Sequence, residues 1–350
     1  MNHNSALSIP VIFGCADTKL TDEEKLFFSS KRPLGLILFS HNCKNPYQVR
    51  SLINEFREIV ESDDAPILID QEGGRVTRLL PPYWRHPPPA NNFSLIFGQN
   101  EEEAKQAAYL NARLVGRELN KLNITVNCSP VLDLPIEGAH NVIGDRALGN
   151  NVHTIISLGN SLTEGMLTEG IVPVMKHIPG HGRAKSDSHL ELPIIDTSLS
   201  VLEKTDFVPF SKLQQLPWAM TAHVIYSAID PNNPATISPK IINDIIRKNV
   251  GFKGVLISDD IGMEALAGNK GERAKAILQA GCDLVLECSG NLNDMVEVAS
   301  AIPLINEKTL ERLDQSEVLR KKNLKKSNSS SKEMLEKVNR IFAKHSISEF

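Results

Sequence analysis

The sequence has no long hydrophobic run. No stretch approaches the roughly 18 consecutive apolar residues that a membrane-spanning helix needs. The first residues, MNHNSALSIPVIFG, show no basic segment followed by a long apolar run, so we expect no secretory signal. These two absences predict a cytoplasmic protein without a membrane partner.

Cysteine is also scarce, and acidic residues slightly outnumber basic ones. The five cysteines are scattered and form no CxxC pair, so neither a disulfide framework nor a structural zinc site is expected. The formal net charge of −4 disfavours a nucleic-acid partner, which would favour a basic surface. The phosphate-binding pattern GxxxxGK[ST] is absent, and the GGR triplet at 73–75 lacks the context of a dinucleotide fingerprint. A nucleotide-binding function is therefore poorly supported.

Eight short apolar segments predict β-strands. Several are apolar almost throughout, as expected for parallel strands buried on both faces. Amphipathic segments separate them, and an eight-fold alternation favours closure into a single (β/α)8 barrel over an open doubly wound sheet. The expected strands are 8–14, 34–39, 66–70, 124–130, 172–177, 218–224, 254–259 and 282–287.

Several of the intervening helices carry clear start and stop signals. Thr21 is placed to cap the first, and Asn45 followed by Pro46 begins the second. The segment 101–122 starts with three acidic residues, which suit the N-terminal end of a helix. The segment 238–250 is a further helix, ended by Gly251.

The chain is expected to form one catalytic barrel over 1–305 and a C-terminal tail over 306–350. We expect the tail to be helical and partly flexible. Its stretch 320–337, RKKNLKKSNSSSKEMLEK, is basic and then rich in Ser and Asn, which is typical of a solvated linker beside short helices. The sequence assigns it no function.

Polar residues gather at the carboxyl ends of the expected strands. In barrel enzymes the active site is built at that face, so this clustering predicts an active site there. Any one of these side chains could instead be a satisfied structural group. The residues are Asp70, Asp133, Lys176, His177, His223, Asp259 and Asp260.

The segment KHIPGHGRAKSDSHLELP at 176–193 is the most informative. It holds His177, His181 and His189, with Asp187 two positions before His189. An Asp near a His can orient the imidazole and favour its protonated form. The alternative is an exposed loop in which these side chains only cap turns.

Two other motifs supply further candidates. In GVLISDDIGMEAL, two adjacent aspartates cannot point the same way on extended backbone, so one should enter the site and the other should bond to backbone or cap the next helix. The residues alone do not choose between Asp259 and Asp260. DQEGGRVTRL places Asp70, Arg75 and Arg78 where they could hydrogen-bond sugar hydroxyls. Arg146 in VIGDRALG is a candidate of the same kind, or a structural ion-pair partner.

Taken in order, GLILFSHN, ILIDQEGGRV, SPVLDL, VIGDRALG, KHIPGHGRAKSDSH and ISDDIGMEAL closely resemble the β-N-acetylglucosaminidases of glycoside hydrolase family 3. The resemblance covers about residues 8 to 300, with Ile178 standing where Phe is common. It implies a (β/α)8 catalytic barrel, Asp259 as the nucleophile, and His189 as the acid/base supported by Asp187. The sugar-binding positions that it implies are Asp70, Arg78, Arg146, Lys176 and His177.

The resemblance also implies a reaction. We expect a retaining glycosidase that removes terminal N-acetylglucosamine from peptidoglycan fragments (muropeptides) or chitobiose-like glycosides during cell-wall recycling, as a monomer needing no metal or organic cofactor. One alternative is a metal-dependent barrel hydrolase, although strand one ends in FGCAD and carries no HxH pair. Others are a β-glucosidase-like specificity, whose acid/base usually comes from an additional domain, and a catalytically silent sugar-binding protein.

Overall fold

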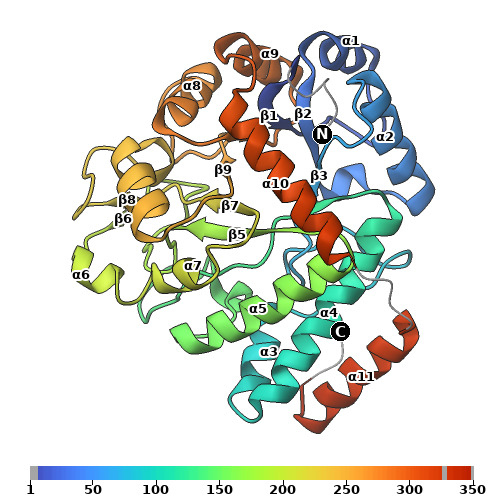
Figure 1. Ribbon diagram of the computed structural model, residues 1–350, viewed down its shortest axis with the longest axis vertical. Coiled ribbons are helices and arrows are strands. Elements are labelled where there is room, and N and C mark those ends of the chain that lie inside the picture. The colour runs from blue at the N-terminus through green and yellow to red at the C-terminus, as the bar shows by residue number, and fades with distance from the viewer. Residues whose placement is uncertain (1–6, 325–328, 348–350) are drawn as a thin grey trace.

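A computed structural model describes residues 7–324 and 329–347 of the chain as a closed barrel of eight parallel strands surrounded by helices (Figure 1). Around the barrel the strands follow the order β1-β10-β9-β7-β5-β4-β3-β2. The predicted (β/α)8 architecture is therefore confirmed. The barrel strands are β1 (Ile9–Phe13), β2 (Pro33–Leu38), β3 (Ile67–Ile69), β4 (Val126–Asn127), β5 (Val172–Ile178), β7 (Trp218–Thr221), β9 (Val255–Asp260) and β10 (Leu284–Glu287).

All eight predicted strands are present, at nearly the predicted positions. Two further strands were not predicted. β6 (Ile194–Ile195) and β8 (Ile225–Tyr226) pair in parallel outside the barrel. Each has only two residues, which is too short to leave a periodic pattern in the sequence.

Helices follow the barrel strands and cover the outside of the barrel (Figure 1). Two long ones, α4 and α5, lie side by side after β3 and β4. The helices are α1 (Asp22–Lys31), α2 (Pro46–Ile59), α3 (Ala90–Phe97), α4 (Glu101–Lys121), α5 (Val152–Thr168), α6 (Leu199–Leu202), α7 (Val208–Lys212), α8 (Lys270–Ala280), α9 (Leu292–Ala301), α10 (Glu307–Asn323) and α11 (Ser331–Lys344), with short 3₁₀ turns η2 (Ser40–Asn42), η3 (Gly144–Arg146) and η4 (Ala235–Ile237).

The helix starts predicted from the capping residues Thr21 and Asn45 are confirmed. Thr21 accepts a hydrogen bond from the Glu24 N–H, and Asn45 accepts one from the Gln48 N–H ahead of α2. The segment predicted at 238–250 is helical, but it is wound as a π-helix, η5 (Ile241–Asn249). Gly251, which follows it, has a φ of +83°, a conformation that glycine adopts without strain.

The hydrophobic core has two layers. Inside the barrel, side chains from all eight strands pack together, among them Ile12, Leu68, Val174 and Ile257. A larger cluster fills the space between the strands and the surrounding helices. Most of the barrel strands contribute to both layers because successive side chains point to opposite faces, which explains the nearly unbroken apolar runs in the sequence.

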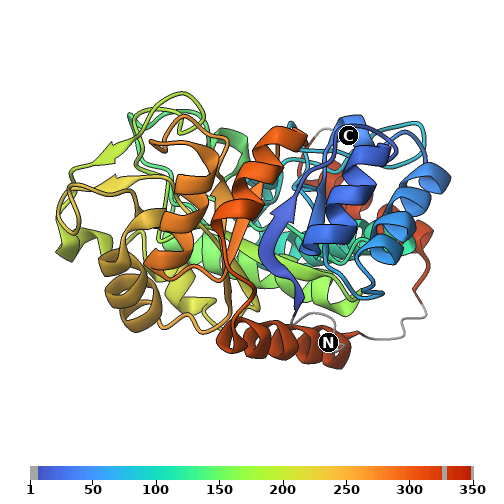
Figure 2. The same ribbon diagram turned by 90° about the horizontal axis from the view of Figure 1, so that it is seen from above.

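The C-terminal helices of the predicted tail pack against the barrel domain. α10 lies across one end of the barrel (Figures 1 and 2), and its Leu313 joins the interior cluster. Farther on, α11 packs on α4, and Lys344 and His345 contact Glu103 at 2.6 and 2.5 Å. Parts of the predicted tail, 325–328 and 348–350, lie outside the described residues, so the domain boundary at 305 and the expected flexibility remain predictions.

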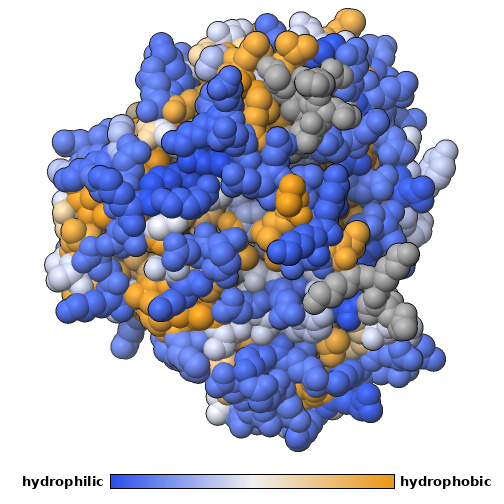
Figure 3. All heavy atoms as spheres, in the orientation of Figure 1, coloured by the Kyte–Doolittle hydropathy of each residue, from blue (hydrophilic) through white to orange (hydrophobic). Residues whose placement is uncertain are grey.

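On the face that carries α10, hydrophilic residues cover most of the surface and the hydrophobic areas are separate and small (Figure 3). None of the helices within 7–324 and 329–347 combines the length and apolar character that a bilayer crossing requires.

Candidate active site

The predicted strand-end residues project into the mouth of the barrel by simple alternation. Leu68 faces the barrel interior, so Asp70, two residues later, follows it on the same side. Val172 and Val174 place Lys176 in the same way, and Val255 and Ile257 place Asp259. Because parallel strands end at one face of a barrel, these groups meet there.

Asp259 lies next to the imidazole of His177. Its Oδ2 is 3.8 Å from His177 Nε2, and its Oδ1 accepts the backbone N–H of Asp260 at 2.8 Å. Burial alone would raise the pKa of the Asp259 carboxyl, but the neighbouring imidazoles, His177 foremost, and the N–H bond from Asp260 outweigh burial and lower it. The carboxylate is therefore ionised at neutral pH.

The neighbouring carboxylate, Asp260, bonds to the backbone at two other positions. Its Oδ1 accepts the N–H groups of Gly262 at 2.9 Å and Cys288 at 3.2 Å. Burial and the nearby charge of Asp259 raise its pKa. Asp260 thus has the backbone-binding role that the residues alone left open between the two aspartates.

His177 is oriented from behind by a buried carboxylate. Asp133 is completely buried, and its Oδ2 is 2.7 Å from His177 Nδ1. Burial works to raise the pKa of Asp133, but the neighbouring His177 lowers it, so the carboxylate is ionised and accepts the Nδ1 hydrogen. This contact leaves Nε2 directed toward Asp259.

A buried network of alternating charges holds Lys176 beside the same site. The Nζ of Lys176 is 2.8 Å from Asp70 Oδ1 and 2.7 Å from Glu72 Oε1. Arg146 forms a two-pronged pair with Glu72, both N–O distances being 2.9 Å. Burial disfavours the charge on Glu72, but Arg146 and Lys176 outweigh burial and lower its pKa to about 2.

Arg78 completes this network from the loop after β3. Its Nη2 is 3.2 Å from Asp70 Oδ2, and its guanidinium lies 5.0 Å from the centre of the Phe39 ring. Arg75, a third candidate from the same motif, instead pairs with Asp145 at 2.8 Å and bonds to backbone carbonyls. Arg75 therefore holds the loop around η3.

Asp187 and His189 form the predicted pair. His189 Nδ1 is 2.7 Å from Asp187 Oδ1, and the His189 N–H also bonds to this oxygen at 3.0 Å. The side chain of His189 is 62% exposed, whereas that of Asp187 is 22% exposed. Burial tends to raise the pKa of Asp187, but the two bonds from His189 outweigh it and lower the pKa. Within the described contacts, no hydrogen bond joins this pair directly to Asp259.

His223, a further strand-end histidine, serves the scaffold. It is completely buried, with Nδ1 2.7 Å from Thr236 Oγ1 and Nε2 3.0 Å from the carbonyl oxygen of Asp260. Burial lowers its pKa. A neutral His223 that donates from Nε2 fixes the backbone beside Asp259.

Sequence reasoning missed two buried carboxylates. Glu72 lies two residues after Asp70 in the same extended segment, so the alternation that placed Asp70 would have placed it as well. Glu287 ends β10 and is completely buried. Its Oε1 accepts the Ser289 N–H at 3.1 Å, and burial raises its pKa to about 7.

The described residues offer no group of three or more His, Cys, Asp or Glu side chains placed to hold a metal ion.

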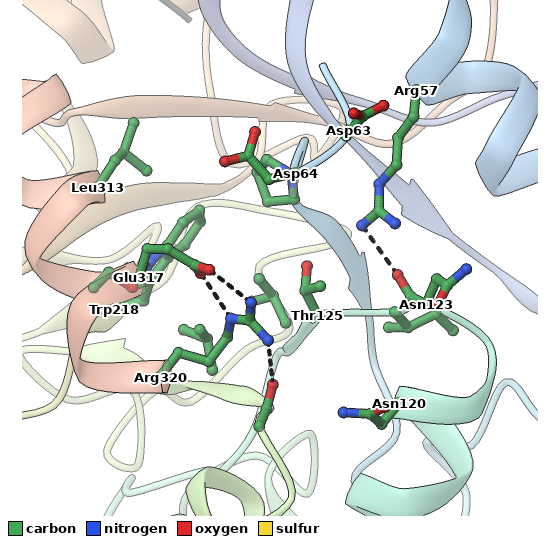
Figure 4. Close-up of a pocket in the computed structure, with 16 residues that line it drawn as sticks. Arg57, Asp63, Asp64, Asn120, Asn123, Thr125, Trp218, Leu313, Glu317 and Arg320 are labelled. Carbon is green, nitrogen blue, oxygen red and sulfur yellow. Dashed lines mark hydrogen bonds and ion pairs between the residues drawn. The ribbon is translucent and has the colours of Figure 1, made fainter. Parts of the chain in front are cut away.

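A cavity of about 240 Å³ lies at the opposite end of the barrel (Figure 4). It is bounded by the starts of β4, β5 and β7 and by α10. Its two arginines are engaged: Arg57 bonds to the Asn123 carbonyl, and Arg320 bonds to Glu317 and the Gly170 carbonyl. This end of a barrel serves stability rather than catalysis, and none of the predicted site residues lies there.

Comparisons with known proteins find a matching family and relatives for this chain. The model of the family described as "Glycosyl hydrolase family 3 N terminal domain" matches residues 11–319. The chain is 39% identical over 284 residues to a β-hexosaminidase of Alkalilimnicola ehrlichii, and the match covers 80% of each chain.

Two solved structures are similar throughout. NagZ from Neisseria gonorrhoeae, in complex with N-trifluoroacetyl-D-glucosamine, has a TM-score of 0.83 at 30% identity and covers 96% of this chain and 98% of its own. A glycoside hydrolase family 3 β-N-acetylglucosaminidase from a Paenibacillus strain has a TM-score of 0.84 at 28% identity, covering 99% of this chain and 69% of its own.

Proposed function

This chain belongs to glycosyl hydrolase family 3 and is a glycosidase, and from that premise we propose that it is a retaining exo-β-N-acetylglucosaminidase. Its proposed substrates carry a non-reducing terminal N-acetylglucosamine, in particular the GlcNAc-1,6-anhydroMurNAc muropeptides of peptidoglycan. The observation that carries the proposal is the ionised Asp259 at the barrel mouth, beside His177 and the Lys176 network. The N-acylated glucosamine bound by the gonococcal relative supports an acylated amino sugar as ligand.

The proposed reaction has two steps. In the first, Asp259 forms a bond to the anomeric carbon while the glycosidic bond breaks and His189 gives its proton to the leaving oxygen. In the second, neutral His189 takes a proton from water, and that water displaces Asp259 from the sugar. A histidine suits this exchange because its unperturbed pKa lies near neutral pH. Asp187 stabilises the protonated form of the ring.

Asp70, Arg78, Lys176 and His177 are proposed to hydrogen-bond the hydroxyls of the sugar. Asp70 holds Arg78 and Lys176 in place, and Asp133 holds His177, so little ordering is required when the sugar binds. Arg146 is committed to Glu72 through both prongs of its guanidinium, and its predicted contact with sugar remains a proposal.

We also propose that the protein acts in cell-wall recycling in the cytoplasm, as a monomer. These assignments rest on the resemblance of its motifs to the family 3 β-N-acetylglucosaminidases.

The test is a comparison of two chromogenic substrates. The wild-type protein is expected to hydrolyse nitrophenyl N-acetyl-β-glucosaminide and to hydrolyse nitrophenyl β-glucoside hardly at all. The two substrates differ in the acetamido group, which the proposed enzyme requires. Asp259→Ala is expected to abolish hydrolysis while the circular dichroism spectrum stays unchanged, because the nucleophile is lost without a change in the fold. Equal rates on the two sugars, or substantial activity in Asp259→Ala, would refute the proposal.

A further inference from the structure

The loop that carries the proposed acid/base contains one buried polar residue. Ser188, between Asp187 and His189, is only 3% exposed although the flanking His189 side chain is 62% exposed. A buried hydroxyl in an exposed segment needs a hydrogen-bond partner inside the protein. The Oγ of Ser188 has one, because it lies 3.1 Å from Nε2 of the buried His181.

His181 in turn belongs to the group around the nucleophile. Its backbone N–H donates to Asp133 Oδ1 at 2.6 Å, while the other oxygen of Asp133 orients His177. The rings of His177 and His181 have their centres 5.7 Å apart. One buried carboxylate therefore fixes both the imidazole beside Asp259 and the residue that binds Ser188.

The rest of the loop is attached only at its ends. At its start, His140 donates its N–H to the Ala184 carbonyl, and Arg183 pairs with Asp206. At its end, the Pro193 carbonyl accepts the Ile225 N–H. Among the hydrogen bonds of the described residues, the Ser188–His181 bond is the one that ties the span 185–192 to the remainder of the protein.

We propose that Ser188 and His181 are positioning residues that hold the loop bearing His189 against the residues around Asp259. This role rests on the proposed glycosidase function, because it matters only if His189 exchanges a proton with the leaving group. Burial lowers the pKa of His181 to about 4, so its ring is neutral at neutral pH. Either tautomer of the neutral ring can bond to a serine hydroxyl, which both donates and accepts.

The test compares kcat/KM for two substrates whose leaving groups differ in their need for a proton. N,N′-Diacetylchitobiose has a sugar leaving group that must be protonated, whereas the dinitrophenyl N-acetyl-β-glucosaminide has one that leaves without it. Ser188→Ala is expected to lower kcat/KM on chitobiose about 10- to 100-fold, less than the 10²- to 10⁴-fold typical of a lost general acid. The value for the dinitrophenyl substrate is expected to change less than threefold (roughly the scatter of such assays) because its first step needs no acid.

Two companion variants sharpen the experiment. Ser188→Thr keeps the hydroxyl and is expected to recover most of the chitobiose activity. Ser186→Ala is the matched control, since Ser186 lies in the same loop and makes no side-chain hydrogen bond among the described residues. In hydrogen–deuterium exchange, Ser188→Ala is expected to speed exchange over 185–192, whereas Ser186→Ala is not.

The outcomes are distinguishable. Unchanged chitobiose activity in Ser188→Ala, equal losses on both substrates, no rescue by threonine, or an unfolded Ser188→Ala protein would each overturn the positioning role. A wild-type protein inactive on both substrates would instead overturn the proposed function, and the positioning role with it.

Discussion

At the scale of single residues, Glu72 is the carboxylate that links the cations of the candidate site. It bridges Lys176 and Arg146, which the resemblance implied as sugar ligands, although the residues alone left Arg146 open as an ion-pair partner. Breaking a buried pair leaves an uncompensated charge, so these cations contribute to stability as well as to any contact with sugar. Residue types and their strand-end positions were predictable from sequence, whereas this pairing depends on segments more than 70 positions apart.

Glu287 provides a prediction for pH dependence at the residue scale. Its folded-state pKa is raised from 4.5 to about 7, so the folded state holds the proton more tightly than the unfolded state. The stabilisation is fully present below pH 4.5 and is lost as the pH rises to about 7, by on the order of 3 kcal/mol. Glu287→Gln stays neutral and keeps an oxygen for the Ser289 N–H, so its free energy of unfolding should not fall over this range on account of residue 287.

Urea unfolding at pH 5 and pH 8 measures this difference. The variant is expected to gain stability over the wild type at pH 8 relative to pH 5. Glu58→Gln, which alters an exposed glutamate, is the control and should follow the wild-type profile. Parallel pH profiles for the wild type and Glu287→Gln would contradict the assignment.

At the scale of elements, local signals predicted where the strands and helices lie. The caps of α1 and α2 were readable because a cap depends on residues within one turn. The π-helical winding of η5 was not, since an amphipathic pattern does not distinguish i→i+4 from i→i+5 hydrogen bonding. The sequence also did not predict where two elements approach each other closely.

The contact between α4 and α5 shows such an approach and gives a second prediction. A Cβ built on Gly165 would lie 2.5 Å from the Tyr109 carbonyl oxygen and 2.7 Å from the Ala112 Cβ. Gly165→Ala is therefore expected to push the helices apart and to destabilise the protein by about 1–3 kcal/mol, although alanine favours helix. Thermal or urea unfolding measures the loss.

Gly98→Ala is the matched control for this contact. Its added Cβ meets only the Leu95 carbonyl oxygen, at 3.8 Å, and its φ of −62° suits alanine. It should be neutral or slightly stabilising. A Gly165→Ala protein as stable as Gly98→Ala would show that α4 and α5 can accommodate the added methyl group.

At the scale of the whole molecule, α10 closes the end of the barrel opposite the site. Besides Leu313, its Ser316 accepts a hydrogen bond from Trp218 Nε1 at 2.9 Å, and its Thr309 bonds to buried Asp283. The family match also continues to residue 319. These contacts favour a barrel unit that includes α10, beyond the boundary predicted at 305.

Leu313→Ala tests whether α10 belongs to the barrel unit. The residue is completely buried in the interior cluster, so we expect a loss of about 2–5 kcal/mol in the free energy of unfolding. The kcat/KM of the folded variant should stay unchanged because the substitution lies at the far end of the barrel. Val318→Ala on the exposed face of the same helix should cost under about 0.5 kcal/mol. Equal stabilities of the two variants would mean that α10 does not contribute to the stability of the barrel.

The sequence by itself determined the eight strands, their parallel closure and the strand-end residues that could carry chemistry. It could do so because periodicity, capping and strand alternation are local properties. Only the tertiary structure decided how Asp260 bonds to distant backbone, which charges neutralise one another, and how Ser188 connects the His189 loop to His181. These features arise between segments far apart in the chain, where burial and distance, rather than residue type, set the strength of an interaction.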